Sequence, residues 1–219
     1  MNPFLHKVPF FQELSPEQLE RVSAICARKG FKAGTVLFRE KEQGDVFYII
    51  LSGSVKVYTN HTGGEEKIMS VFQAGDSFGE LSLIDGKPRS ASAQVLEDSA
   101  FLTIRGSDFL ALLQEQPDIS VGIMRELCRR LRDTNNHVYD LTFLDARTRV
   151  IKNLITLANR HGTRSGNLIH IRMMLNHEEL ARMAGVSRNI LSQVLRDFEA
   201  LKMLTVSHDS FTLDLSKLR

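Results

Sequence analysis

The chain has 219 residues, more than a typical single domain of roughly 100 to 150 residues, so two domains are expected. Hydrophobic residues make up 42% of it and charged residues 25%, a composition that excludes a disordered or fibrous protein. The net charge is only +2, but residues 146–219 hold 12 Lys and Arg against 6 Asp and Glu, which suggests a polyanionic partner for this basic third.

The sequence carries no sign of a membrane segment, a disulfide framework or a metal site. No stretch of about 18 apolar residues occurs, and Met1–Phe11 lacks the apolar run of a signal peptide, so we expect a cytoplasmic protein without a membrane partner. Cys26 and Cys128 are too few for a disulfide framework and lack the close spacing of zinc ligands. Both are expected to be buried thiols.

The first predicted element is a helix with a defined start. Ser15 is placed as its N-cap, Pro16 occupies the first helical position, and Gln18 can complete a capping box. These residues predict one helix that runs to about Arg28.

Short β-rich runs separated by glycine turns follow, between Gly34 and Ile104. The runs are Thr35–Phe38, Val46–Leu51, Ser54–Tyr58, Lys67–Phe72 and Ala91–Ile104, and the turns lie at Gly44, Gly53, Gly63-Gly64 and Gly75. Because no helical pattern is interleaved with them, they predict an antiparallel sandwich or jelly-roll barrel. A closed barrel of this size can hold one small ligand. The whole chain is then an α+β protein.

A helical pattern covers Asp108–Gln114, and another begins after Pro117 and continues to Arg160, so a long helix is expected over much of that span. Within it, apolar residues alternate at spacings of three and four, at Met124, Leu127, Leu131, Thr134, Val138 and Leu141. Such a heptad seam predicts a parallel helix dimer. Thr134, its one polar member, is either tolerated there or used for another purpose.

The C-terminal third carries a helix-turn-helix pattern, after a polar loop at residues 161–167 and a short predicted strand at Ile169–Ile171. Asn176 and Glu179 can form a capping box for a first helix, which Gly185 ends. Ser187 can cap a second helix, whose apolar stripe is Ile190, Leu191, Val194, Leu195, Phe198 and Leu201. A predicted hairpin, Leu204–Val206 and Phe211–Leu215 with the turn His208-Asp209-Ser210, completes a winged helix-turn-helix.

The second helix of this motif presents polar side chains that suit a DNA major groove. Off its apolar stripe lie Arg188, Asn189, Ser192, Gln193 and Arg196, next to the capping Ser187. Arginine can donate two hydrogen bonds to guanine, and asparagine or glutamine can pair with adenine, while Ser192 and Arg196 suit phosphate contacts. The alternative is that these residues form a polar helix face that only contacts water. The basic charge of the domain and the turn before the helix favour DNA binding over this alternative.

Residues 78–93, FGELSLIDGKPRSASA, have the chemistry of a phosphate and sugar cradle. Backbone N–H groups near Gly79, Leu81 and Ser90 can bind an anion, Arg89 can neutralise a phosphate, and Glu80 can accept a hydrogen bond from a ribose hydroxyl. The alternative for Glu80 and Arg89 is a buried ion pair that braces the barrel.

This segment, with Phe143-Leu144-Asp145 and Val186-Ser187-Arg188, resembles the CRP/FNR family of bacterial transcription regulators along the whole chain. The resemblance implies a sensor domain at 1–116, a dimerisation helix at 117–145 and a DNA-binding domain at 146–219. It implies a homodimer that binds a palindromic operator in double-stranded DNA, with cAMP as effector and RNA polymerase as a further partner. The implied ligand contacts are Gly79, Glu80, Leu81, Arg89, Ser90, Arg130, Thr134 and Asn135.

Two departures from the family pattern concern specificity. Thr134 would contact adenine, but the family's following Ser, which reaches the nucleotide of the other subunit, is Asn135 here. Arg188 matches the family's guanine-reading arginine, whereas its usual Glu and second Arg are replaced by Asn189 and Gln193. We therefore expect a half-site with one guanine contact and more A·T pairs.

Three alternative functions fit the sequence less well. The nearest alternative is the same architecture with a different effector or none. A jelly-roll metalloenzyme would need two or three histidines on the barrel, where only His61 lies. A cyclic-nucleotide-binding subunit that regulates a protein partner leaves the basic helix-turn-helix without a role. No catalytic constellation is present, so no enzyme activity is expected.

Overall fold

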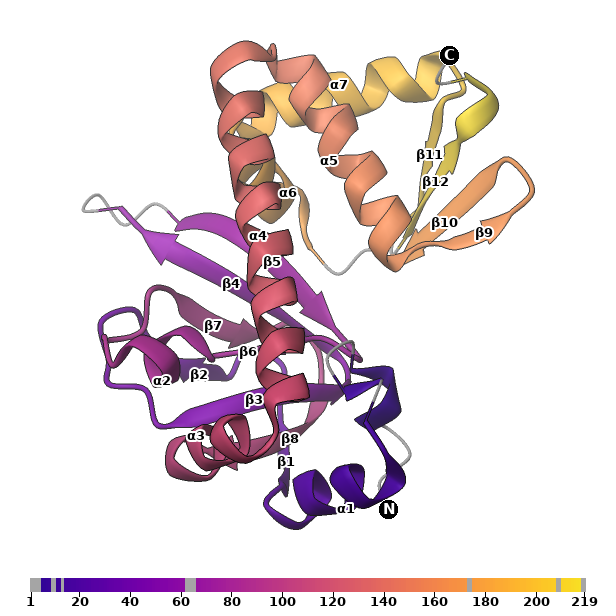
Figure 1. Cartoon of the computed structure of the whole chain (residues 1–219). Helices are drawn as coiled ribbons and strands as arrows, with labels where there is room; N and C mark the ends of the chain where they lie inside the picture. Colours follow the sequence, from indigo (N-terminus) through magenta and orange to yellow (C-terminus); the bar gives the residue numbers. More distant parts are fainter. Residues whose placement is uncertain are drawn as a thin grey trace. The chain divides into compact units, whose positions relative to one another are not determined.

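The computed structural model describes residues 5–8, 11–12, 14–61, 66–172, 175–207 and 210–217. The chain forms two compact units, Met1–Thr59 with Met69–Asn135 and Asn60–Ile68 with Asn136–Arg219. Figure 1 shows the helices and strands of both units with their labels. The predicted turns at Gly63-Gly64 and His208-Asp209 lie outside the described residues.

The N-terminal helix begins as predicted and ends earlier. A short 3-10 turn at Leu5–Lys7 precedes α1, Pro16–Ala24, in which Ser15 and Gln18 form both hydrogen bonds of the capping box. The predicted extension to Arg28 is wrong, because β1, Ala27–Phe31, pairs there with a later strand from Thr103 to Ser99. Pairing with distant residues therefore overrides the local helical pattern.

Two four-stranded sheets make up most of the first unit and confirm the predicted antiparallel β architecture. Their strand orders are β1-β8-β3-β6 and β2-β7-β4-β5. The strands are β2 (Val36–Phe38), β3 (Val46–Ser52), β4 (Ser54–Asn60), β5 (Glu66–Gln73), β6 (Ser77–Phe78), β7 (Ser92–Val95) and β8 (Ser99–Arg105). The run predicted as one strand from Ala91 to Ile104 is two strands, one in each sheet.

Alternating side chains of β3 supply two hydrophobic clusters. Tyr48 and Ile50 point between the sheets, where the Tyr48 ring stacks on Phe78 at a centroid distance of 5.2 Å. Phe47 and Ile49 lie in a second cluster with the helices, and Phe47 stacks on Phe109 at 4.5 Å. Full burial of each such side chain contributes about 1.5–3 kcal/mol. The sheet that contains β3 is therefore covered on both faces.

Helix α2 (Leu81–Asp85) lies between β6 and β7, and α3 (Gly106–Glu115) and α4 (Pro117–Phe143) follow β8. The helical pattern that extends to Arg160 is divided, because Asp145 caps a new helix, α5 (Ala146–His161), by accepting a hydrogen bond from the Thr148 N–H. The short helix α2 was not expected from the sequence.

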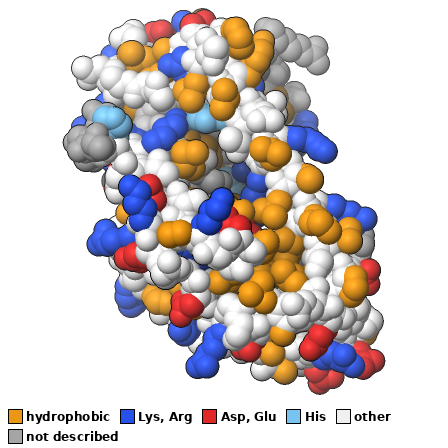
Figure 2. Space-filling model, turned by 60° about the vertical axis from the view of Figure 1, so that its left-hand side comes forward, with side chains coloured by type: hydrophobic (Ala, Val, Ile, Leu, Met, Phe, Trp, Pro, Cys, Tyr) orange, Lys and Arg blue, Asp and Glu red, His pale blue; other side chains and the backbone are white. Residues whose placement is uncertain are grey.

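Most of the predicted seam on α4 forms an exposed stripe. Five of its six residues, Met124, Leu131, Thr134, Val138 and Leu141, are exposed, and so is Cys128 on the same helix. Leu127, the sixth, is partly buried against the cluster of Phe47. Figure 2 shows such exposed hydrophobic side chains gathered into patches on one face of the molecule.

The second unit contains α5, the predicted helix-turn-helix and a small sheet of order β11-β12-β10-β9. Its elements are β9 (Thr163–Ser165), β10 (Leu168–Arg172), α6 (His177–Ala184), α7 (Arg188–Ala200), β11 (Leu204–Val206), β12 (Ser210–Asp214) and a 3-10 turn (Leu215–Lys217). The winged helix-turn-helix is thereby confirmed. The segment predicted as a loop after α5 contains β9, which forms a hairpin with β10.

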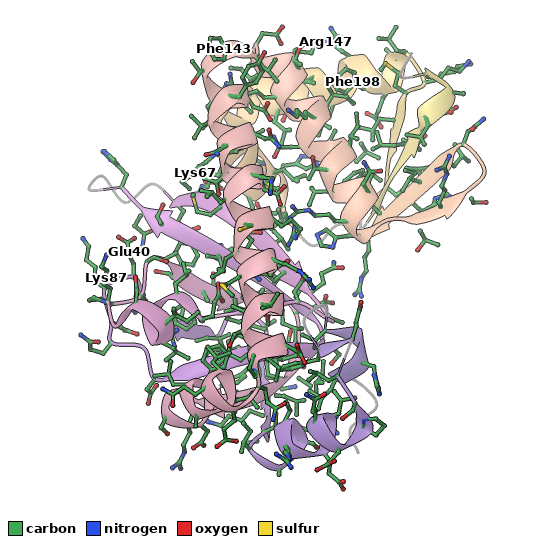
Figure 3. The ribbon with its side chains drawn as sticks, in the orientation of Figure 1. Glu40, Lys67, Lys87, Phe143, Arg147 and Phe198 are labelled. Carbon is green, nitrogen blue, oxygen red and sulfur yellow. The ribbon has the colours of Figure 1, made fainter. Side chains whose placement is uncertain are left out.

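The caps of this motif form as the sequence predicts. Asn176 and Glu179 make the reciprocal hydrogen bonds of a capping box, Gly185 ends α6 with φ of 64°, and Ser187 accepts from the Ile190 N–H. Arg147 on α5 lies over the Phe198 ring of α7, with its Cζ 5.1 Å from the ring centroid (Figure 3).

The apolar stripe of α7 is narrower than predicted. Leu191, Val194, Leu195 and Phe198 are buried, whereas Ile190 is 42% exposed and Leu201 55% exposed. The assignment of Ile190 and Leu201 to the core-facing stripe was therefore wrong.

The two cysteines also differ from each other. Cys26 is half-buried, and burial raises the pKa of its thiol to about 12, but Cys128 is exposed, which corrects the prediction that both are buried. In the described part of the chain no helix is long and apolar enough to cross a membrane. The same residues contain no group of three or more His, Cys, Asp or Glu side chains that could hold a metal ion.

Candidate functional site

Arg89 occupies a buried position in the barrel before β7. Its side chain is 5% exposed, and it donates from Nη1 to the Gly79 carbonyl at 2.6 Å and to Ser82 Oγ at 2.9 Å. Nη2 donates to the Val46 carbonyl at 2.7 Å, and the Phe38 ring lies 4.2 Å from Cζ. Burial lowers the pKa of the guanidinium, and its buried Nε has no hydrogen-bond partner. An anion could supply that partner.

Two glycines make room for this guanidinium. A Cβ on Gly44 would lie 2.6 Å from Arg89 Cζ, and a Cβ on Gly79 would lie 2.9 Å from Arg89 Nη1. Gly79 also has φ of 88°, a conformation that residues with side chains rarely adopt. From the sequence alone, Gly44 is expected only at a turn, because its second role depends on packing that no local pattern predicts.

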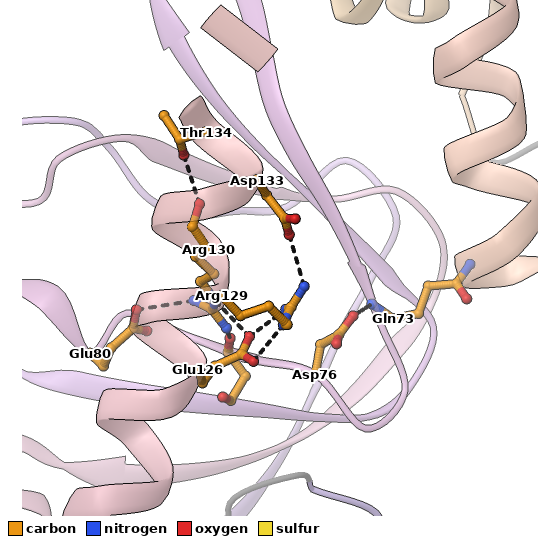
Figure 4. A network of polar contacts seen from close by, with 9 residues as sticks. Gln73, Asp76, Glu80, Glu126, Arg129, Arg130, Asp133 and Thr134 are labelled. Carbon is orange, nitrogen blue, oxygen red and sulfur yellow. Dashed lines mark hydrogen bonds and ion pairs between the residues drawn. The ribbon is translucent and has the colours of Figure 1, made fainter. Parts of the chain in front are cut away.

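Glu80 is the second buried charge of the site, at 5% exposure. Its Oε1 accepts a hydrogen bond from Nη1 of Arg130 on α4 at 3.0 Å, while its buried Oε2 has no partner (Figure 4). The alternative of a bracing ion pair between Glu80 and Arg89 is not what the structure shows, because Glu80 pairs with Arg130. One acceptor of Glu80 and one donor of Arg89 therefore remain unused.

Arg130 connects helix α4 to this site. Its Nη2 donates to the Ser77 carbonyl at 2.6 Å, and its Cζ lies 4.9 Å from the centroid of the Phe72 ring. Thr134, one helical turn later, is exposed and donates from Oγ1 to the Arg130 carbonyl at 2.9 Å.

The predicted ligand residues thus fall into two groups. The hydrogen bonds above bring together the first group, Gly79, Glu80, Arg89 and Arg130. The second group is exposed: Leu81 lies on α2, Ser90 follows Arg89, and Thr134 and Asn135 lie on α4. Sequence reasoning missed Ser82 and Glu126; the spacing of four residues between Glu126 and Arg130 is the helical signal that could have found the latter.

The predicted DNA-reading residues lie on α7 as expected from their spacing. Arg188, Asn189, Gln193 and Arg196 are exposed, with Ser187 at the cap, whereas Ser192 is half-buried. The Gln193 amide donates to Asp197 Oδ1 at 3.1 Å, and Arg196 Nη2 donates to Gln193 Oε1 at 2.9 Å.

An arginine that sequence reasoning missed secures the turn before this helix. Arg149 on α5 donates to the carbonyl oxygens of Leu144, Ala184 and Gly185, at 2.8, 3.1 and 3.0 Å. A cation is favoured at the C-terminal end of α6, where backbone carbonyls lack partners. The turn between the two helices is therefore held from α5.

Comparison with known families gives two matches. The family model of the cyclic nucleotide-binding domain matches residues 28–116, and that of the Crp-like helix-turn-helix domain matches residues 148–219. The CRP-like cAMP-activated global transcriptional regulator of Mycobacterium tuberculosis is 34% identical over 198 residues, covering 90% of this chain and 88% of that protein. The cyclic AMP receptor protein of Thermus thermophilus is 36% identical over 187 residues, covering 85% and 83%.

Solved structures with the same fold agree. The c-di-GMP responsive global regulator CLP of Xanthomonas campestris has a TM-score of 0.77 and 25% identity, covering 91% of this chain and 99% of that one. The catabolite activator protein of Thermus thermophilus has a TM-score of 0.57 and 30% identity, covering 96% and 95%. These similar proteins are named as regulators, with effectors that differ between them.

Proposed function

The chain belongs to the CRP/FNR family of bacterial transcription regulators, and we propose that it is a homodimer whose DNA binding is controlled by cAMP. Membership makes it a cyclic-nucleotide-binding transcription regulator, and its relatives are regulators and not enzymes. In the proposal, residues 1–116 sense the ligand, residues 117–145 dimerise and residues 146–219 bind DNA.

One observation carries the proposal: two buried charges each keep one polar atom without a partner. These atoms are Arg89 Nε and Glu80 Oε2. An unsatisfied buried polar atom costs about 1–3 kcal/mol, so a ligand that supplies the missing partners is favoured. A phosphate accepts from the arginine, and a ribose hydroxyl donates to the carboxylate. A cyclic nucleotide has both groups at one end.

The remaining predicted contacts complete this ligand. Gly79, Leu81 and Ser90 would surround the phosphate with backbone and hydroxyl donors, and Thr134 would reach the adenine base. Asn135 would bond the nucleotide held by the other subunit. The two relatives that are named for cAMP, at 34% and 36% identity, support this choice of effector.

The dimer is proposed to form along the exposed stripe of α4. Leu131, 62% exposed in the single chain, is the central apolar residue of that stripe. Repeats of three and four residues let two parallel helices pack side by side. Because Arg130 on the same helix is bonded to Glu80, ligand binding at Glu80 acts directly on the dimer helix. A coupling of about 1–3 kcal/mol would change DNA affinity roughly 5- to 150-fold.

The two α7 helices of the dimer would enter successive major grooves, one helical turn of DNA apart. Arg188 is proposed to read guanine, Asn189 and Gln193 to read adenine, and Ser187, Ser192 and Arg196 to contact phosphates. The operator would be palindromic and rich in A·T pairs around one guanine. The regulator would act in the cytoplasm, with RNA polymerase as its protein partner.

A second candidate keeps the same regulator with a different effector or none. The regulator CLP, which is 25% identical and named for c-di-GMP, supports this alternative. So does Asn135, which replaces the family's serine.

Selection of operators from a random DNA library by the purified protein, at fixed salt with and without cAMP, tests the proposal. We expect a two-half-site sequence to be enriched only when cAMP is present. Equal enrichment without cAMP would remove cAMP as the switch and leave DNA binding in place. Calorimetry with cAMP, cGMP and c-di-GMP would then identify the effector. G·C pairs at the positions that Asn189 and Gln193 contact would refute the assignment of these two residues to adenine.

A further inference from the structure

Glu126 lies on α4, one helical turn before Arg130, and links two arginines. Its Oε1 accepts from Arg130 Nε at 2.8 Å and from Arg129 Nη2 at 2.6 Å, and its Oε2 accepts from Arg129 Nε at 2.8 Å (Figure 4). The Glu126 side chain is mostly buried, with an exposed fraction of 15%. Neither Glu126 nor Arg129 is among the residues that the ligand is proposed to touch.

Each nitrogen of Arg130 therefore has a separate acceptor. Nε bonds Glu126, Nη2 bonds the Ser77 carbonyl, and only Nη1 bonds Glu80. Arginine and a carboxylate often pair through two parallel hydrogen bonds when both are free to do so. Here the pair with Glu80 has a single bond, and Glu80 Oε2 has no partner.

Two arginines favour the charged form of the Glu126 carboxylate. Burial alone would raise the pKa of Glu126, but hydrogen bonds from Arg129 and Arg130 outweigh it and lower the pKa below its ordinary value. Arg129 is itself held by a second carboxylate, since its Nη1 donates to Asp133 Oδ2 at 2.9 Å. The carboxylate that holds Arg130 is thus ionised.

We propose that Glu126 is a positioning residue, which holds Arg130 to a single bond with Glu80 and so keeps Glu80 Oε2 free for a hydroxyl of the ligand. Without Glu126, Arg130 can turn and pair with both oxygens of Glu80. The acceptor meant for the ligand would then be occupied before the ligand arrives. This inference rests on the proposed function, in which the ribose 2′-hydroxyl of cAMP donates to Glu80.

The test compares E126Q with the unaltered protein, using cAMP and 2′-deoxy-cAMP as probes in calorimetry on the full chain. The unaltered protein should bind cAMP on the order of tenfold more tightly than the deoxy analogue, because the analogue lacks the hydroxyl that donates to the charged Glu80 carboxylate. In E126Q that ratio should fall to about two or less, mainly through weaker cAMP binding. The deoxy analogue should bind both proteins nearly equally.

D133N is the matched control, because it also removes a carboxylate from the Arg129 side of this network. It should keep the tenfold ratio. The affinities for cAMP and for its deoxy analogue are compared within one protein, so a moderate loss of stability in E126Q does not affect their ratio. Thermal unfolding of each variant is measured alongside. A full ratio retained in E126Q would overturn the role of Glu126 alone. No cAMP binding by the unaltered protein would overturn both this role and cAMP as the effector.

Discussion

Arg89 and Val46 are joined by a 2.7 Å hydrogen bond from the arginine Nη2 to the valine carbonyl oxygen, which fixes a buried guanidinium to strand β3. Two further acceptors, the Gly79 carbonyl and Ser82 Oγ, hold Nη1. The cation is therefore in place before any ligand enters. A group that is already ordered loses less conformational entropy on binding, which favours affinity.

The first prediction concerns the shape of this cation. In R89K the positive charge remains, but a single ammonium cannot serve three acceptors and still donate to a phosphate. We expect cAMP affinity to fall on the order of ten- to a hundredfold, since a hydrogen bond to a charged group contributes about 1.5–3 kcal/mol. Calorimetry measures this. K87A, at an exposed lysine on the same loop (Figure 3), should change the affinity less than twofold; a similar loss in both variants would contradict the prediction.

The second prediction assigns a base contact to Ile190. This side chain was expected in the core, but it is 42% exposed on α7, next to Arg188 and Asn189. An exposed apolar side chain on a recognition helix can contact the methyl group of thymine. We therefore expect I190A to bind the selected operator about three- to tenfold more weakly, as loss of such a contact costs about 1 kcal/mol or somewhat more.

The control for Ile190 lies in the DNA. Replacing thymine by deoxyuridine removes only the methyl group, so the unaltered protein should lose affinity at one position of each half-site. I190A should show no further loss there when binding is measured by fluorescence anisotropy. Equal losses in both proteins at every position would show that Ile190 does not contact a thymine methyl.

Helix caps were predictable because their signals are local. Ser15, Asn176 and Ser187 each cap the helix that the sequence assigned to them. Capping needs only residues within four positions of each other, so packing elsewhere does not alter it.

Features set by contacts between distant residues could not be read in the same way. Leu127 has the spacing of a seam residue, yet packs on its own barrel, and Arg28 follows a helical pattern but lies in β1 opposite Leu102. At the site, the residue types were found from the sequence. That Glu80 pairs with Arg130, 50 residues away, and not with Arg89 depends on where α4 lies against the barrel.

The third prediction locates the dimer seam with the cysteine of α4. Cys128 is exposed on the stripe that contains Met124 and Leu131, so in a parallel dimer it should face the same residue of the partner. Mild oxidation of the C26S variant should therefore give a covalent dimer on a non-reducing gel. The half-buried Cys26 is removed so that only Cys128 can react.

Moving the thiol by one position supplies the control. In C26S/L127C/C128S the cysteine takes the place of Leu127, which packs against the barrel of its own chain, and little covalent dimer should form. Efficient cross-linking at residue 127 and none at residue 128 would instead support the seam predicted from the sequence. Sedimentation of each unoxidised variant checks that the oligomeric state is unchanged.

The last prediction concerns His161, at the end of α5. Burial, with a smaller contribution from the Arg160 charge, lowers the pKa of His161 from 6.5 to about 4. Between these values the unfolded chain binds a proton that the folded chain does not, so acid favours unfolding. The stabilising effect of a neutral His161 is complete above about pH 6.5 and is lost as the pH falls toward 4. Because the ring is partly exposed, we expect a loss of about 1–2 kcal/mol rather than the full value of the shift.

H161Q, which cannot titrate at this position, tests the prediction. Between pH 7 and pH 4.5, its free energy of unfolding in urea should fall by about 1–2 kcal/mol less than that of the unaltered protein. His137, whose pKa is also lowered by burial, titrates in both proteins and cancels in the comparison. Equal losses of stability in the two proteins would show that His161 does not contribute to the acid sensitivity.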